Sequence, residues 1–285
     1  MTLNQRITKD LNELYNGGNT PGVIQDALQL NGLIPAKAGQ TSFATMALNG
    51  YYSGDLEAKT VMVMFNPGCD VSVANSNLPN ELQKRNMKNA VDFANFHDYS
   101  KNYGHYDRLR QDAFDLKQAF FLKSWQNSGI AIPKSLCANS GKQAKLDSKE
   151  IVLTQKLQLD LIPYASSKFE EFTGNISLVF PFLETLFDAI FSFPRKYVIF
   201  CSGKFETIFK EYEKANPGTI SCIRKAKKKI PGRENAVSCS VITVKYQSKE
   251  IRAIIANTFH DRSLPNAYNQ MEAYGEFCYQ EFIKP

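Results

Sequence analysis

The sequence predicts a single α/β domain with a central, mainly parallel sheet between helices, a three-layer α/β/α architecture. Apolar runs of strand length occur at residues 60–65 and 197–201, and stretches of helical periodicity lie between them. Strands that alternate with helices in this way favour parallel pairing and helices on both faces of the sheet. A chain of 285 residues buries a sizeable core, and one large α/β domain accounts for its length.

The expected elements follow in order along the chain. They are a helical lead-in within residues 1–55, a strand at 60–65, helices around 82–96 and 109–125, a strand at 151–153 or at 157–162, a helix from 181, a strand at 197–201, a helix after 203, a hairpin of 237–246 and 251–257, and a C-terminal helix carrying 271–282. Ligands of parallel sheets bind at the carboxyl ends of the strands. This rule singles out the loops that begin at Asn66, after Asp160 and at His260.

Composition excludes several classes of protein. The hydrophobic share of 43% and the charged share of 22% are those of a globular chain rather than a disordered or fibrous one. No stretch reaches the length of apolar sequence that a membrane span needs, and no signal sequence is recognisable. The six cysteines lack metal-ligand spacing and are interpreted as buried thiols. We therefore expect a cytoplasmic monomer that binds no metal and no cofactor.

Positive charge is concentrated in one segment. The net charge is +6, and six basic residues lie within residues 224–233, Lys227, Lys228 and Lys229 among them. A run of this kind is usually a solvated loop. It gains a role in binding only if a nucleic-acid motif accompanies it.

Three short motifs are candidates for such an accompanying motif. Residues Met64-Phe65-Asn66-Pro67-Gly68 close the first strand, Leu159-Asp160-Leu161-Ile162-Pro163 close the second, and His260-Asp261-Arg262-Ser263-Leu264 follow the last. Their order and spacing resemble the uracil-DNA glycosylase superfamily, in the branches whose first motif is G-x-N-P-G. The departures are Met64 for glycine, Asp160 for asparagine, and Asp261-Arg262 for a proline-serine pair. The resemblance covers residues 60–284 and implies a DNA glycosylase.

The resemblance assigns the chemistry to two residues. Cleavage of an N-glycosidic bond places positive charge on the sugar and negative charge on the departing base, so a positioned water and a donor to the base are needed. Asn66 would orient the water and His260 would donate to the leaving base. An N-P-G turn or a loop histidine taken alone is usually without catalytic role. Their joint position after the first and last strands favours catalysis.

Asp160 and Phe65 are assigned to base reading. An asparagine at the position of Asp160 donates to a pyrimidine O4, whereas a carboxylate only accepts and therefore matches the amino group of cytosine. We expect a modified cytosine as the target, since excision of ordinary cytosine would destroy the host's own DNA. Invading phage DNA would carry such a base. The alternative is that Asp160 only braces a loop or caps a helix.

Base flipping and DNA contact account for the remaining assignments. A flipped base leaves a gap that an apolar wedge fills, and Leu264 is placed for it, although a buried loop leucine is the commoner outcome. Phosphate contacts are assigned to Arg262, Ser263, Lys227, Lys228 and Lys229.

Two other functions stay open at this stage. One is a uracil-DNA glycosylase of base-excision repair, and the other is a catalytically silent DNA-binding relative. The sequence decides neither the excised base nor the preference for single or double strands.

Overall fold

The computed structural model describes residues 1–15, 51–65, 86–96, 113–163, 175–259 and 264–285. Contacts divide the chain into two compact units, and each collects separate stretches of sequence. The first contains Met1–Tyr52, Met64–His97 and Leu159–Ser192, and the second contains Ser53–Val63, Asp98–Gln158 and Phe193–Pro285. The expectation of a single domain stays a prediction.

The described part of the first unit contains helices together with end residues of three strands. Its helical elements are α1 (Leu3–Tyr15), α5 (Ala90–Phe96), the 3-10 turn η2 (Ile176–Val179) and α9 (Phe180–Phe191). Helix α1 packs against α5 and α9, and its Ile7 and Leu11 are fully buried, which confirms the predicted lead-in helix. Pro181 occupies the first turn of α9, where a missing N–H costs no hydrogen bond.

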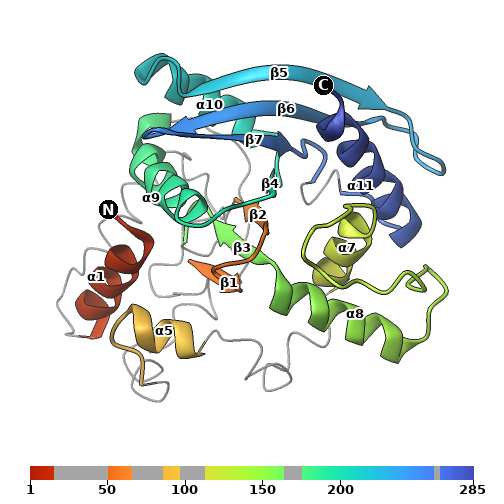
Figure 1. Cartoon of the computed structure of the whole chain (residues 1–285), viewed down its shortest axis with the longest axis horizontal. Coiled ribbons are helices and arrows are strands. Elements are labelled where there is room, and N and C mark those ends of the chain that lie inside the picture. Colours follow the sequence, from red (N-terminus) through yellow and green to blue (C-terminus); the bar gives the residue numbers. More distant parts are fainter. Residues whose placement is uncertain (16–50, 66–85, 97–112, 164–174, 260–263) are drawn as a thin grey trace, which may run out of the picture. The chain divides into compact units, whose positions relative to one another are not determined.

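Within its described residues, the second unit contains most of a seven-stranded sheet and four helices (Figure 1). The strands are β1 (Tyr52–Gly54), β2 (Thr60–Met64), β3 (Leu157–Asp160), β4 (Tyr197–Phe200), β5 (Ile220–Lys228), β6 (Val237–Tyr246) and β7 (Lys249–Ile255), in the order β1-β3-β2-β4-β7-β6-β5. The helices are α7 (Ala113–Leu122), α8 (Lys142–Gln155), α10 (Lys204–Ala215) and α11 (Tyr268–Ile283).

The sheet is mixed. Strand β4 pairs in parallel with β2 on one side and with β7 on the other, whereas β6 pairs antiparallel with both β7 and β5. The α/β class is thus confirmed, and the mainly parallel sheet is not. Strand β5 accounts for part of the difference, because its exposed basic residues lack the apolar alternation that predicts a strand.

Helices α10 and α11 lie on opposite faces of β6. Ser240 and Ile242 of β6 face the residues of α10, and the neighbouring Cys239 contacts Cys278 of α11, as the alternation of a strand requires. Helix α11 also packs closely on α7. At Gly275 a Cβ atom would lie 1.8 Å from the carbonyl oxygen of Phe121, so only glycine allows this approach.

Most predicted elements are confirmed within the described residues. The hairpin of β6 and β7, the strand β4 and the helices α9, α10 and α11 lie where the patterns predict them. Of the two candidates for the second strand, residues 157–160 form β3, and residues 151–153 lie inside α8. Helix α5 confirms the C-terminal part of the helix predicted around residues 82–96, and α7 confirms the middle of the one predicted around 109–125.

Candidate functional site

Several strand ends meet at one edge of the sheet in the second unit. Strands β2, β4 and β7 run in parallel, with Val63 beside Phe200 and Phe200 beside Ile255. Because β6 is antiparallel to both of its neighbours, β5 has the same direction as β7. The carboxyl end of β5 therefore lies at the same edge as those of β4 and β7.

The register across β5, β6 and β7 shows how closely these ends are aligned. Lys227 of β5 is the partner of Ser238, and the backbone N–H of Ser238 donates to Thr258 Oγ1 at 2.8 Å. Thr258 follows β7 and comes just before the predicted histidine loop. The lysines that end β5 are therefore level with the start of that loop.

The basic residues 224–228 form an edge strand, so their interpretation as a solvated loop is wrong. Arg224 donates to the carbonyl oxygen of Pro285 at 2.6 Å, and Lys225 Nζ lies 3.0 Å from Glu206 Oε2. Lys227, Lys228 and Lys229 are exposed, and within the described residues no ion pair engages them. The run thus divides into a structural part and a solvent-facing part.

A polar network surrounds Glu206 in the first turn of α10. Ser240 Oγ donates to Glu206 Oε1, Asn257 Nδ2 donates to the same oxygen at 2.8 Å, and Lys225 donates to Oε2. Burial raises the pKa of Glu206, but these hydrogen bonds and the charge of Lys225 outweigh burial and lower the pKa overall. Glu206 is therefore a carboxylate that connects α10, β5, β6 and the segment after β7.

Asp160 and Phe65 lie in the first unit at the ends of β3 and β2. The N–H of Leu161 donates to the carbonyl oxygen of Met64, and the N–H of Ile162 donates to that of Phe65, both at 3.0 Å. The structure therefore brings the two base-reading candidates to adjacent chain segments. Phe65 is only 7% exposed, so its ring is not open for stacking in this conformation.

The cavity beside Asp160 is small. Asp160, Arg6, Tyr51, Phe182 and Thr185 are among the residues that line it, and its volume is about 20 Å³. A cavity of this size holds about one water molecule, whereas sites for small ligands start at about 300 Å³. This cavity is therefore too small to hold a base.

Leu264 is buried, with 9% of its surface exposed. A side chain that fills the gap in a duplex has to project into solvent. The burial therefore favours the alternative already open from the sequence, in which Leu264 is a buried loop leucine.

The remaining predicted site residues lie outside the described residues. They are Asn66, His260, Arg262 and Ser263. Their assignments stay predictions.

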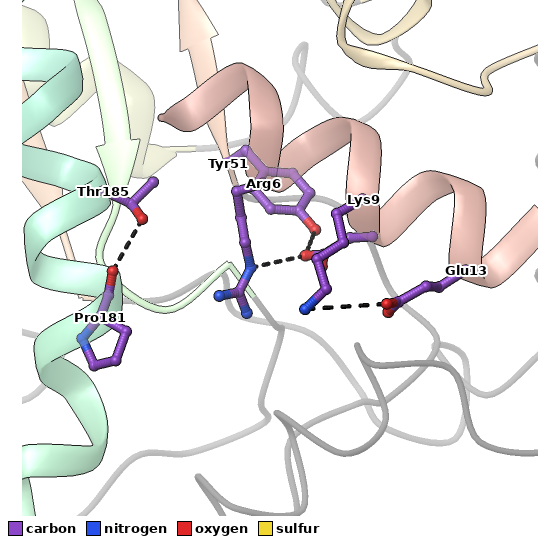
Figure 2. A network of polar contacts seen from close by, with 7 residues as sticks. Arg6, Lys9, Glu13, Tyr51, Pro181 and Thr185 are labelled. Atoms are coloured by element: carbon purple, nitrogen blue, oxygen red, sulfur yellow. Dashed lines mark hydrogen bonds and ion pairs between the residues drawn. The ribbon is translucent and has the colours of Figure 1, made fainter. Parts of the chain in front are cut away.

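A second polar network lies in the first unit (Figure 2). Arg6 Nε donates to Asp10 Oδ2 at 3.2 Å, Tyr51 donates its hydroxyl proton to the same oxygen, and the Arg6 guanidinium lies 4.3 Å from the ring centroid of Phe182. Arg6 is 6% exposed and Asp10 is fully buried. Sequence reasoning missed this pair, although an Arg and an Asp four residues apart on a helix are a recognised signal.

The cysteines differ from the expectation in part. Cys201, Cys239 and Cys278 are buried thiols, but Cys137 and Cys222 are exposed. Cys222 is exposed because it lies on the edge strand β5. Across the described ranges, no cluster of three or more His, Cys, Asp or Glu side chains has the arrangement that holds a metal ion.

Glu206 and Asn257 are the site residues that sequence reasoning missed. The available signal was an acid in the first turn of a helix that follows a buried strand, Phe200-Cys201-Ser202-Gly203-Lys204-Phe205-Glu206. Such an acid interacts favourably with the helix dipole. Its partners on β5, β6 and the segment after β7 come from sequence positions too distant for any local pattern.

Comparison with known proteins finds no matching family model, no matching curated protein and no matching solved structure. None of the helices in the described part of the chain combines the length and apolar character needed to cross a membrane.

Proposed function

We propose that the protein is a monofunctional DNA glycosylase of the uracil-DNA glycosylase type, with a modified cytosine as its target base. The observation that carries the proposal is the common direction of β2, β4, β7 and β5. In the sequence, Asn66 follows β2 and His260 follows β7, and exposed lysines lie at the carboxyl end of β5. Ligands of open α/β sheets bind at the carboxyl ends of the strands.

In the proposed reaction, the bond between the sugar carbon and the base nitrogen breaks first, and water then adds to the sugar cation. The electron pair of that bond leaves with the base, and a hydrogen bond from His260 stabilises the negative charge. Asn66 holds the water through its amide, which cannot remove a proton, so the water is captured late in a dissociative transition state. After it adds to the sugar carbon, the water loses a proton to solvent, and the base anion takes up a proton from solvent, so the products are an abasic site and the free base.

The lysines supply affinity rather than base selection. Lys227, Lys228 and Lys229 would contact phosphates, which position the DNA without reading its sequence. Each phosphate contact lowers the slope of log affinity against log salt by about 0.9 on duplex DNA. Replacement of all three by alanine is therefore expected to flatten this slope by roughly 2 to 3.

Incubation with oligonucleotides tests the activity. Duplexes and single strands would carry uracil, cytosine, hydroxymethylcytosine or glucosylated hydroxymethylcytosine, and alkali would then break any abasic site. We expect cleavage only at a modified cytosine. Cleavage at uracil alone would keep the enzyme class and overturn the assignment of Asp160. No cleavage on any of these DNAs would contradict the proposed activity.

Variants assign the roles. Asn66→Ala and His260→Ala are expected to slow single-turnover cleavage by about 100- to 1000-fold, with DNA affinity retained. Lys134→Ala, at an exposed position, is the matched control and should cleave at the original rate. Asp160→Asn should lose activity on the cytosine-type base, because an amide presents its NH₂ to the base amino group unless it turns over.

A catalytically silent DNA-binding protein is the second candidate. The burial of Phe65 and Leu264 and the water-sized cavity beside Asp160 favour it. Such a protein would bind DNA with the same dependence on salt and would leave no abasic sites. The cleavage assay and a binding assay on the same oligonucleotides therefore separate the two candidates.

A further inference from the structure

Strand β5 is an edge strand with solvent on both faces. Within the described strands it pairs with β6 alone, and most of its residues are exposed. It is nine residues long, longer than a typical strand. The backbone N–H and C=O groups on its outer side form a template on which another strand can pair.

A groove runs beside β5 on the face that carries α10. Its volume is about 720 Å³, and its apolar part consists of Phe209, Ile220, Cys222, Ile242 and Ile255. Successive side chains of a strand point to opposite faces. A strand added to β5 would therefore direct every second side chain toward this groove.

The carboxylates that line the groove already have hydrogen-bond or ion-pair partners. Glu213 accepts hydrogen bonds from the backbone N–H groups of Gly218 at 2.6 Å and Ile220 at 2.5 Å. Glu211 pairs with Lys214 at 2.7 Å, and Glu206 is engaged by three donors. Each carboxylate is thus already bonded.

Lys210 also lines the groove and is exposed. No ion pair engages it among the residues that the structure describes. Along β5, Arg224 and Lys228 are the partners of residues on the α11 face of β6, and Lys225 and Lys227 are the partners of residues on its α10 face. Arg224 and Lys225 are already engaged. The solvent-facing Lys228 and Lys227 therefore supply the available positive charge, one on each face of the edge strand.

The positive charge of β5 favours one kind of binding partner over the others. A second copy of β5 would oppose lysines to lysines, and like charges across a strand pair are destabilising. A phosphodiester offers acceptors alone, whereas a strand edge presents alternating donors and acceptors that a peptide backbone matches. An extended peptide with acidic side chains satisfies both the backbone and the charges.

We propose that β5 and the adjoining groove bind an extended acidic segment of a partner protein by strand addition. The backbone of the segment continues the sheet beyond β5, as in other complexes of this mode. Its carboxylates meet the basic side chains on both faces, and one or two apolar side chains enter the groove. This inference does not depend on the glycosylase proposal.

Selection from a displayed library of random linear peptides, each about twelve residues long, tests the proposal on the full-length protein. We expect selected peptides to combine acidic residues with alternate apolar ones. The best peptide would then be synthesised, and hydrogen exchange of the β5 backbone amides would be measured with and without it. A second version of the peptide, with N-methyl groups on alternate amides, should bind at least 10-fold more weakly. Its methylated amides cannot form the backbone hydrogen bonds that pair a strand with β5.

Three variants complete the test. Cys222→Trp fills the groove without a change of charge, and Lys210→Glu reverses a charge that the DNA proposal does not use. Each of these two variants should bind the peptide at least 5-fold more weakly. Lys134→Glu, at an exposed position elsewhere, should bind it with unchanged affinity. The proposal is overturned if no acidic peptides are selected, if the bound peptide leaves β5 amides unprotected, or if a single-stranded oligonucleotide protects those amides and the peptide does not.

Discussion

The two units of the protein each contain a carboxylate held by several donors, and the two differ in access to solvent. Asp10 in the first unit is fully buried and accepts hydrogen bonds from Arg6 and Tyr51 (Figure 2). Glu206 in the second unit keeps 28% of its side-chain surface exposed and lies on the groove beside β5. The hydrogen bonds are similar in kind, but the surroundings are not.

Burial distinguishes a structural carboxylate from an accessible one. Removal of one partner from a buried ion pair leaves a charge without compensation in a medium of low dielectric constant. The same removal near the surface exposes the remaining charge to water and counterions. The Asp10 network is therefore expected to affect stability, whereas the Glu206 network also bears on the loop that precedes His260.

The largest expected effect is that of Asp10→Ala. It removes the Asp10 carboxylate from a buried ion pair, so the free energy of unfolding should fall by about 3–5 kcal/mol. Urea denaturation followed by circular dichroism measures it. The double variant Arg6→Met with Asp10→Leu removes both charges and should lose less than Asp10→Ala, and a greater loss would contradict this account.

Tyr51→Phe should have the next largest effect. It removes one donor to the Asp10 carboxylate and keeps the ring, which packs against Phe93 with centroids 5.6 Å apart. A hydrogen bond to a charged group contributes about 1.5–3 kcal/mol, and the free energy of unfolding should fall within that range. Tyr15→Phe, which changes no residue of this network, is the control and should leave the urea midpoint in place.

Glu206→Gln is expected to cost about 1 kcal/mol, because an amide oxygen still accepts from Ser240 but the charge opposite Lys225 is lost. Its effect should depend on pH. The folded state lowers the pKa of Glu206 below its usual 4.5, so the carboxylate contributes stability above that pH. This contribution is lost as the pH falls through the folded-state pKa. Urea midpoints of both proteins should therefore converge in acid, and a constant difference would show that the charge of Glu206 is not responsible.

The smallest expected effect belongs to Lys214→Ala. Lys214 and Glu211 lie 2.7 Å apart, but the side chain of Lys214 is 61% exposed. Exposed pairs contribute less than about 1 kcal/mol, so its urea midpoint should move little. A shift as large as that of Tyr51→Phe would show that distance, rather than burial, decides the strength of these pairs.

Most of the fold follows from local sequence patterns. The runs at β2 and β4 are almost purely apolar, and all their residues are buried, so a short window identifies them. The turn of the last hairpin at Gln247 and Ser248 lies between alternating strands and was equally recognisable. Strand β5 was not, because a basic edge strand is stabilised by its pairing with β6 rather than by burial of its own side chains.

The candidate site was predictable only in outline. The expectation that strand ends carry the functional loops follows from the parallel order, which is confirmed for β2, β4 and β7. The network of Glu206, Ser240 and Asn257 joins residues from three separate elements, so no spacing in the sequence indicates it. Whether Leu264 is a wedge or a packed leucine depends on tertiary contacts, and its burial could not be inferred from the motif.

Strand β4 has a consequence for how the chain folds during synthesis. It pairs with β2 from early in the chain and with β7 from late in it. Translation adds residues from the N-terminus, and a domain folds as a unit once its segments have emerged. The centre of the sheet therefore stays open on one side until residue 255 has left the ribosome. Until then the β7-facing edge of β4 keeps its backbone N–H and C=O groups unpaired, and the side chains of β4, which are all buried in the finished fold, stay open to contact with other nascent chains.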